Sequence, residues 1–303
     1  MMQITHFNEM YDWLKNRKKV RIAIAGTDRE EIRLAAKASS LGLAEFILIG
    51  NTEKIRSIMI EELSVNHDLF EIYSADTETE AAKLAVSLTK QGAADIPMKG
   101  LIQTSVFMKA VLNRESGLKT NSRISQITLF ENKNNGITFL TDCAVNLSPE
   151  LSVRLDVIKN AVTLSWSLGV DCPKVALLGA VETVNESMPD TIQSAVITQM
   201  NRRGQIKDCV IDGPLSLDNA ISMEAVQRKG IDSPVAGRAD ILIASSLQEA
   251  NTLSKSLHFY AGFATASVIM GTEQPFVMTS RTDAIENKLN SIAVTCYYNQ
   301  NQI

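Results

Sequence analysis

The chain reads Val20-Arg21-Ile22-Ala23-Ile24-Ala25-Gly26 near its beginning, a run whose apolar residues alternate before a glycine, as in a β-strand. Thr27 and Glu30 follow with the spacing of a capping box, which predicts the start of a helix. Apolar residues at helical spacing continue from Ile32 to Leu41. A strand that leads directly into a capped helix is the repeating unit of an α/β fold.

The same unit recurs through the first half of the chain. Residues 45–50 and 70–73 read as further strands, and residues 77–91 read as a helix. Residues 7–14 carry apolar side chains at helical spacing ahead of the first strand. This alternation predicts an α/β fold with a mostly parallel sheet and helices on both of its faces, an α/β/α arrangement.

The alternation is interrupted once, by two extended runs at residues 124–131 and 137–144. They are joined by Asn132-Lys133-Asn134-Asn135-Gly136, in which Asn-Gly is a strong hairpin signal. We therefore expect an antiparallel ribbon here, with a domain boundary directly after it.

A second α/β set follows the ribbon. Ser148-Pro149 has the serine and the proline that favour the start of a helix. The four strands predicted after that helix are at residues 175–180, 209–212, 241–244 and 266–270.

A last strand at residues 276–278 and a helix with an apolar stripe from Ile285 to Cys296 close the pattern. We expect this strand and helix to pack on the first domain. A chain of 303 residues commonly forms more than one core. The expected domains are residues 1–144 plus 272–303, and residues 145–271.

Composition narrows the class of protein. The formal net charge is -4 and no long Lys/Arg run is present, so nucleic acid is not an expected partner. The four cysteines and three histidines are scattered, without C-x-x-C or H-E-x-x-H spacing, so we expect no metal. No apolar run approaches the roughly 20 residues of a membrane span, and no signal-peptide pattern opens the chain. We expect a cytoplasmic protein without a membrane partner.

Polar loops suggest where a site lies. The stretches Asp212–Ala220, Asp232–Asp240 and Thr279–Asp283 are each interpreted as a turn at the end of an apolar run. Loops that leave the carboxyl ends of strands line the ligand crevice of an open α/β sheet. Asp, Ser and Arg side chains gathered there would form a polar site on an apolar sheet.

The segment from Ser280 to Glu286 precedes the last helix and has two interpretations. A helix N-terminus attracts anions, and Arg281 adds a planar fork suited to phosphate. In the functional interpretation, Ser280 donates to a reacting carbonyl or thiolate, and Asp283 or Glu286 is the acidic partner. In the structural one, Asp283 and Glu286 are only a capping box.

Other motifs are less specific. Ser233-Pro234-Val235-Ala236-Gly237-Arg238 suits either an ordinary turn or close backbone approach to a ligand. Asp212-Gly213-Pro214 is a turn signal. Lys99 suits a point charge for phosphate or a solvated surface position, and Ser105, after Thr104, suits a helix cap. Neither G-x-G-x-x-G nor G-x-S-x-G is present, which disfavours dinucleotide binding and a serine nucleophile.

Several of these stretches together resemble the phosphate acetyltransferase and phosphate butyryltransferase family, most closely its butyryl branch. The resemblance covers nearly the whole chain. It is carried by Met98–Leu101, Phe139–Asp142, Arg203–Lys207, Asp212–Leu215, Asp218–Ile221, Lys229–Gly237, Thr279–Arg281 and Leu289–Ala293. The family implies reversible transfer of an acyl group between coenzyme A and inorganic phosphate. It also implies two α/β/α domains flanking a cleft, a fold related to isocitrate/isopropylmalate dehydrogenases, and a homodimer.

On this basis coenzyme A or acyl-CoA and inorganic phosphate are substrates, and no permanently bound cofactor is expected. The catalytic candidates are Ser280, Arg281, Asp283 and Glu286. The substrate-binding candidates are Lys99, Thr104, Ser125, Asp212, Ser233, Pro234, Gly237, Arg238 and Asn251.

The chain also departs from the family pattern. Residues 246–251 lack the usual Asp-x-Glu-Ala-Gly-Asn, a common Ser-His pair is Ser125-Gln126, and Asn287 stands where the acetyl branch has an Asp. The alternatives are therefore an acetyl-specific enzyme, a divergent acyl-CoA-binding relative with little activity, and a metal- and NAD-dependent decarboxylating dehydrogenase of the related fold. The absence of a clustered Asp set counts against the dehydrogenase.

Overall fold

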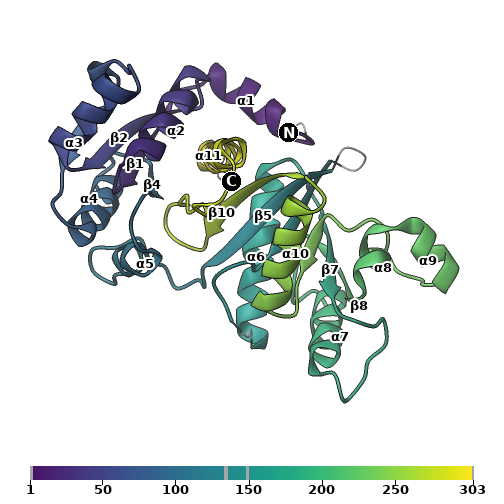
Figure 1. The fold of residues 1–303 in the computed structure, drawn as a ribbon. Helices are drawn as coiled ribbons and strands as arrows, with labels where there is room; N and C mark the ends of the chain where they lie inside the picture. The colour runs from purple at the N-terminus through teal and green to yellow at the C-terminus, as the bar shows by residue number, and fades with distance from the viewer. Residues whose placement is uncertain (1–2, 133–135, 148–149, 302–303) are drawn as a thin grey trace. The chain divides into compact units, whose positions relative to one another are not determined.

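A computed structural model describes residues 3–132, 136–147 and 150–301. The chain forms two compact units (Figure 1). One contains Met1–His6 and Arg123–Thr265, and is called unit 1; the other contains Phe7–Ser122 and Ala266–Ile303, and is called unit 2. The hairpin therefore falls in unit 1. The sequence prediction placed it with the first domain, most of which corresponds to unit 2.

Unit 2 contains a parallel four-stranded sheet in the order β3-β2-β1-β4. The strands are β1 (Val20–Ala25), β2 (Ala44–Gly50), β3 (Glu71–Ser74) and β4 (Ile96–Lys99). Ile22, Ala23, Ile24 and Ala25 have no exposed surface, as expected for a central parallel strand covered on both faces. The predicted strands near residues 20–26, 45–50 and 70–73 are confirmed.

The strand order contains a topological switch. The chain runs outward from β1 to β2 and β3, then returns through α4 (Glu78–Lys90) to β4 on the other side of β1. Right-handed crossovers put α4 on the face opposite α2 (Arg29–Ser40). The loops that follow β1 and β4 therefore diverge from adjacent strand ends, and this is where α/β sheets bind ligands.

The remaining helices of unit 2 complete its layers. They are α1 (Phe7–Lys15), α3 (Thr52–Ser57), α5 (Thr104–Val111) and α11 (Ile285–Gln300). The predicted helix near residues 7–14 and the last helix are confirmed. α11 contacts α1, α2, β1 and β2. Its apolar stripe is extended by buried polar side chains, namely those of Asn287, Asn290, Ser291 and Thr295.

The last predicted strand is shorter than expected. Phe276 and Val277 form single β-bridges to Ile269 and Met98 instead of a continuous strand. The bridge to Met98 is parallel, so this segment lies beside β4 in unit 2.

Unit 1 is built on a mixed sheet in which β5-β6-β9-β7-β8 are neighbours in that order. Its strands are β5 (Ser125–Asn132), β6 (Gly136–Thr141), β7 (Lys174–Leu178), β8 (Val210–Leu215) and β9 (Ile241–Ile243). β5 and β6 are antiparallel, which confirms the hairpin; residues 133–135 of its loop lie outside the described residues. The parallel pairing of β6 with β9 explains why the ribbon belongs to this unit.

The helices of unit 1 are α6 (Leu151–Ser167), α7 (Pro189–Arg202), α8 (Leu217–Ile221), α9 (Met223–Lys229) and α10 (Leu247–Phe259). Ser148 and Pro149, predicted to start α6, lie outside the described residues, and Glu150 is the N-cap residue. β10 (Ala264–Met270) starts in the residue range of unit 1 and continues into that of unit 2.

Asp212-Gly213-Pro214 forms part of β8 and not the turn that the sequence suggested. The sheet order ends at β8, and an edge strand tolerates a proline because its outer N–H positions need no partner strand. A register shift opposite these residues, between Ala176 and Leu178, accommodates the irregularity.

Two glycines of unit 2 test how tightly the end of β1 is packed. Gly26 and Gly92 both have a φ of +76°, so alanine at either position is strained by about 1–2 kcal/mol. A Cβ at Gly26 would overlap Cγ2 of buried Ile102, whereas a Cβ at Gly92 would meet nothing within 4 Å. We expect Gly26→Ala to lower the free energy of unfolding by about 1–3 kcal/mol more than Gly92→Ala, as measured by denaturant titration. Equal losses would show that this end of β1 is loosely packed.

Candidate functional site

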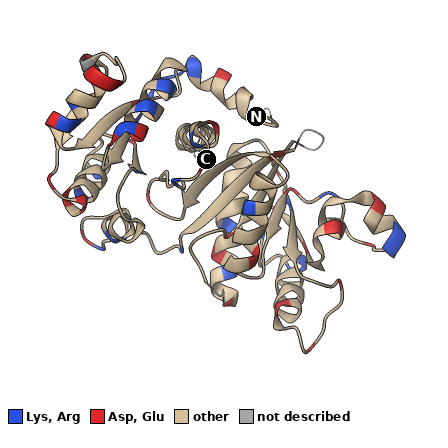
Figure 2. Cartoon of the chain, viewed as in Figure 1, with Lys and Arg blue, Asp and Glu red and all other residues tan. Residues whose placement is uncertain are grey.

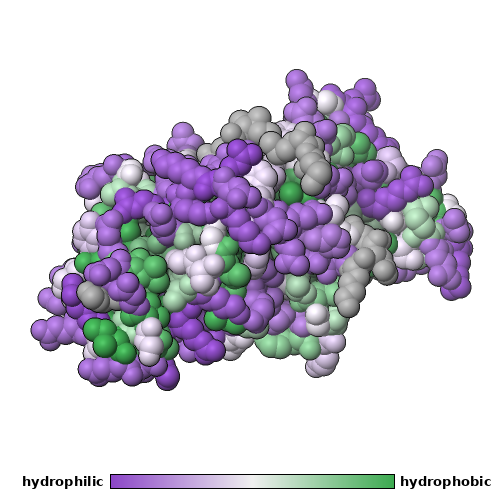
Figure 3. Space-filling model, turned by 90° about the horizontal axis from the view of Figure 1, so that it is seen from above, coloured by the Kyte–Doolittle hydropathy of each residue, from purple (hydrophilic) through white to green (hydrophobic). Residues whose placement is uncertain are grey.

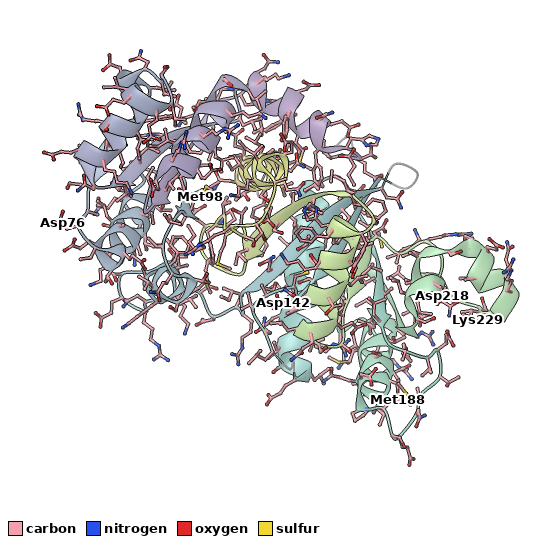
Figure 4. All side chains as sticks on the ribbon, viewed as in Figure 1. Asp76, Met98, Asp142, Met188, Asp218 and Lys229 are labelled. Atoms are coloured by element: carbon pink, nitrogen blue, oxygen red, sulfur yellow. The ribbon has the colours of Figure 1, made fainter. Side chains whose placement is uncertain are left out.

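A pocket of about 250 Å³ lies in unit 2 at the switch between β1 and β4. It is lined by the first turns of α2, by the end of β4 with the residues after it, and by the loop ahead of α11. The lining residues are Asp28, Arg29, Glu30, Glu31, Leu34, Met98, Lys99, Gly100, Leu101, Thr279, Ser280, Arg281 and Lys288. We call it the switch pocket. Figure 4 labels Met98 on β4, which marks its position.

Backbone pairing brings the C-terminal loop to this pocket. The N–H of Val277 donates to the carbonyl of Pro97 over 3.2 Å, and the N–H of Lys99 donates to the carbonyl of Val277 over 3.0 Å. These two bonds hold residues 276–277 against β4. Thr279, Ser280 and Arg281 then enter the pocket wall directly after this segment.

Lys99 is buried, with 7% of its surface exposed, although the sequence also allowed a solvated position. Its Nζ donates to the carbonyls of Gly100 over 3.1 Å and Ile102 over 3.4 Å. An ammonium has three N–H donors, so these contacts leave one for a ligand. Burial, and then the charge of Arg281, lower the pKa of Lys99.

Ser280 and Arg281 line the pocket, and Asp283 holds their loop. The Ser280 backbone N–H donates to Asp283 Oδ2 over 2.8 Å, and the Ser280 hydroxyl lies 3.0 Å from that of Thr282. Arg281 is exposed at the pocket wall. Cationic Lys99 and Arg281 therefore line the same pocket as a hydroxyl donor, a combination suited to an anionic oxygen-rich group.

The predicted capping box of Asp283 and Glu286 is wrong. α11 begins at Ile285, its N-cap residue is Ala284, and no side chain caps it. Asp283 instead bonds the backbone of Ser280, and Glu286 lies 3.3 Å from Lys37 Nζ. Its own backbone N–H and Lys37 lower the pKa of Glu286.

The capping box at the start of α2 is displaced by one residue from the predicted one. Asp28 is the N-cap and Glu31 is its partner, in place of Thr27 and Glu30. Thr27 instead donates its hydroxyl to Ile24, and this side chain is buried. Asp28, Arg29, Glu31 and Lys288 also line the pocket and were not predicted. The position of the first three directly after β1 was a signal for them, whereas Lys288 lies on α11.

Other predicted substrate-binding residues are placed elsewhere. Thr104 is the exposed first residue of α5, with Gln103 as the N-cap residue, so the predicted cap at Ser105 is wrong. Ser125 has no exposed surface and accepts from Asn160 Nδ2 over 2.9 Å. Asp212 lies 3.6 Å from Arg202, and Asn251 donates to the carbonyl of Cys143 over 3.1 Å.

The Asp232–Asp240 loop is not at the carboxyl end of a strand. It follows α9 and enters β9 at its amino end, because in this part of the sheet it joins a helix to the next strand. The Ser233 hydroxyl accepts from the N–H groups of Val235 and Ala236, each over 3.1 Å. Pro234 is exposed. Gly237 and Arg238 line a separate pocket of about 470 Å³ in unit 1.

One further feature of unit 1 was not predicted from the sequence. Asp142, labelled in Figure 4, lines a small cavity with Asn146, Arg154 and Ser246 near the ends of β6 and β9. Arg154 is 1% exposed, and its Nη1 donates to Gln193 Oε1 over 2.8 Å. Burial lowers the pKa of Arg154. No short sequence pattern predicts a buried arginine inside a helix.

Metal ligands and membrane helices are not features of the residues described. Among residues 3–132, 136–147 and 150–301, no three His, Cys, Asp or Glu side chains gather as a metal site would need. Within the same ranges, no helix has the length and apolar character to cross a bilayer. Hydrophilic residues predominate on the face seen in Figure 3, with smaller hydrophobic groups between them.

Comparison with known proteins identifies similar sequences over nearly the whole chain. The profile of the family described as "Phosphate acetyl/butaryl transferase" matches residues 75–296. Phosphate butyryltransferase from Clostridium acetobutylicum is 39% identical over 293 residues, covering 96% of this chain and 97% of that protein. Probable phosphate butyryltransferase from Bacillus subtilis is 42% identical over 279 residues, covering 91% and 92%.

A solved structure extends the similarity to the fold. The branched-chain phosphotransacylase from Enterococcus faecalis V583 has a TM-score of 0.83 and 31% sequence identity to this chain. The match covers 93% of this chain and 99% of that one.

The coupling between the two cations can be measured. Arg281→Ala is expected to raise the pKa of Lys99, because the Arg281 charge is one cause of its lowering. Arg281→Lys keeps the charge and is the matched control. The Lys99 ¹³Cε shift, followed through a pH titration of lysine-labelled protein, reports the pKa. An identical Lys99 titration in Arg281→Ala and wild type would rule out this coupling.

The same shift predicts a trend in stability. Because folded Lys99 holds its proton less tightly than unfolded Lys99, the unfolded chain binds more protons between the two pKa values. The contribution of Lys99 to the free energy of unfolding therefore rises with pH in that range. We expect the free energy of unfolding to rise less with pH in Arg281→Ala than in Arg281→Lys.

Proposed function

This chain belongs to the phosphate acetyl/butaryl transferase family, and we propose that it moves a short or branched acyl group reversibly between coenzyme A and inorganic phosphate, with the phosphate held in the switch pocket. The observation that carries the assignment of the site is the convergence of Lys99 and Arg281 on one pocket at the β1–β4 switch.

The reaction needs few groups from the protein. Phosphate attacks the thioester in one direction, and the coenzyme A thiol attacks the acyl phosphate in the other, each through a tetrahedral oxyanion. Lys99 and Arg281 attract and orient the phosphate, Arg281 through two parallel N–H donors. The Ser280 hydroxyl donates to the reacting carbonyl oxygen. Holding both substrates in line contributes about 7–11 kcal/mol without a covalent enzyme intermediate.

Asp283 is assigned a positioning role, since its carboxylate accepts from the Ser280 N–H and so fixes the loop that carries Ser280 and Arg281. Glu286 was the other predicted acidic partner. Its carboxylate lies 3.3 Å from Lys37 Nζ.

The predicted residues of unit 1 remain proposals for binding the rest of the substrates. They are Ser125, Asp212, Ser233, Pro234, Gly237, Arg238 and Asn251. Thr104 of unit 2 is proposed to bind substrate as well. A homodimer, a cytoplasmic location, the absence of a permanent cofactor and a relation to the isocitrate/isopropylmalate dehydrogenase fold also belong to the proposal. The non-catalytic and dehydrogenase alternatives have less support, because the matched relatives above are named as phosphotransacylases. The acyl-chain comparison below distinguishes the acetyl-specific alternative from the butyryl one.

Release of free thiol from acyl-CoA tests the function. With butyryl-CoA we expect release that requires phosphate and is unchanged by EDTA. We expect kcat/KM for butyryl-CoA and branched acyl-CoAs to exceed that for acetyl-CoA, because each buried methylene contributes about 0.8 kcal/mol. A maximum at acetyl-CoA would favour the acetyl-specific alternative. Release that EDTA abolishes, or no phosphate-dependent release with any acyl-CoA, would contradict the proposal.

Substitution of Arg281 tests the site. Arg281→Ala is expected to lower kcat/KM about a hundredfold, because a hydrogen bond to a charged group contributes about 1.5–3 kcal/mol. The melting temperature should hardly change, since Arg281 is exposed. Arg228→Ala removes an exposed arginine that is paired with Glu224 on α9, and it should leave both quantities unchanged. A loss of kcat/KM below threefold in Arg281→Ala would show that phosphate does not bind in this pocket.

A further inference from the structure

The switch pocket contains three carboxylates that have no part in the acyl transfer described above. They are Asp28, which is the N-cap residue of α2, and Glu30 and Glu31 in the first turn of that helix. The helix carries both signs of charge (Figure 2). Coenzyme A presents a thiol that must lose its proton to attack an acyl phosphate.

The contacts of the three carboxylates separate them. Asp28 lies 2.9 Å from Lys54 and also caps α2, so its charge is already compensated. Burial acts to raise the pKa of Asp28, but the bonds from Lys54 and the Arg29 N–H together lower it. Glu30 is exposed, whereas Glu31 is partly buried in the pocket.

Glu31 is placed among the groups that handle phosphate. Its carboxylate accepts from the Asp28 N–H over 3.2 Å, which fixes the side chain in the first turn of α2. The charge of Glu31 acts on Lys99, and that of Lys288 acts on Glu31, so the three groups are electrostatically coupled in one pocket. Leu34 and Met98 supply apolar wall beside them.

We propose that Glu31 is the general base that takes the proton from the thiol of coenzyme A and returns it in the reverse direction. This inference rests on the proposed acyl transfer. The S–H proton passes to a Glu31 oxygen, and the thiolate sulfur forms a bond to the acyl carbon. The bond from that carbon to the phosphate oxygen breaks, its electron pair stays on phosphate, and the released phosphate takes the proton from Glu31.

The surroundings of Glu31 suit this role. Burial raises its pKa, against the opposing effect of its hydrogen bonds and Lys288. A base accepts a proton from a thiol more readily as its pKa approaches that of the thiol. The sign for activity follows: Glu31 is protonated, and inactive as a base, up to a higher pH than an ordinary glutamate. The rate of acyl-CoA formation should therefore fall on the acid side of neutrality at a higher pH than a normal carboxylate would give.

Glu31→Gln separates the catalytic role from the capping role, because Gln at this helix position also accepts from the N-cap N–H. Glu53→Gln is the matched control: the same change in the first turn of α3, at an exposed residue outside the switch pocket. The assay follows acyl-CoA formation from butyryl phosphate and coenzyme A between pH 5 and 9, and the melting temperature of each variant is measured in parallel.

We expect Glu31→Gln to lower kcat about a hundredfold or more at neutral pH, with KM and melting temperature little changed. The acidic limb of the wild-type pH profile should disappear, and the deficit should shrink toward pH 9, where more of the thiol ionises without a base. Glu53→Gln should stay within about threefold of wild type. Glu31→Asp should retain the acidic limb at a reduced rate.

The outcomes distinguish this inference from the proposed function. Wild type that forms no acyl-CoA overturns both. An active wild type with a Glu31→Gln rate within threefold, or with the acidic limb retained in that variant, overturns the role of Glu31 alone. If Glu31→Gln loses stability as well as rate, its loss of rate relative to wild type is compared at neutral pH and at pH 9. A loss that is as large at pH 9 as at neutral pH overturns the inference. A loss that is smaller at pH 9 supports it.

Discussion

The pairing of residues 276–277 with β4 is the contact on which the candidate site depends. Two backbone hydrogen bonds, from Val277 to Pro97 and from Lys99 to Val277, fix the C-terminal segment beside a strand from much earlier in the chain. Backbone bonds set position closely because each depends on a fixed peptide geometry. Ser280 and Arg281 follow this segment directly after Met278 and Thr279. Without this pairing, nothing would hold Arg281 in the same pocket as Lys99.

Strand order then explains why this end of the sheet is open. β1 leads into α2 on one face, and β4 follows α4 from the other, so their loops separate and leave a crevice. Lys99 ends β4 with its ammonium tied to two carbonyls, which holds the charge in place despite burial. A buried ammonium that is already oriented loses little entropy when a ligand accepts its remaining N–H. The cost of burial appears as the lowered pKa of Lys99.

Sequence patterns predicted the elements better than their contacts. Apolar runs and helical spacing located most strands and helices, and Asn-Gly located the hairpin, because these signals are local.

Capping was less certain: Thr27-Asp28-Arg29-Glu30-Glu31 permits a capping box in two registers, and packing of Thr27 against β2 selects the second. Asp283 and Glu286 have the right spacing for a cap, yet Asp283 bonds Ser280.

Lys99 resembled a solvated turn residue because its neighbour Val277 is distant in sequence. The Asp232–Asp240 loop was assigned to the wrong strand end, since spacing does not distinguish a loop that enters a strand from one that leaves it.

The central claim is that Lys99 and Arg281 bind one and the same phosphate. A double-mutant cycle on the dissociation constant of inorganic phosphate tests this directly, with wild type, Lys99→Met, Arg281→Ala and the double variant measured by calorimetry. If both cations hold the same anion, the second substitution should weaken binding much less than it does alone, with a coupling free energy of at least about 0.5 kcal/mol. Effects that add to within about 0.3 kcal/mol would show that the two side chains act on separate groups, and would contradict the account.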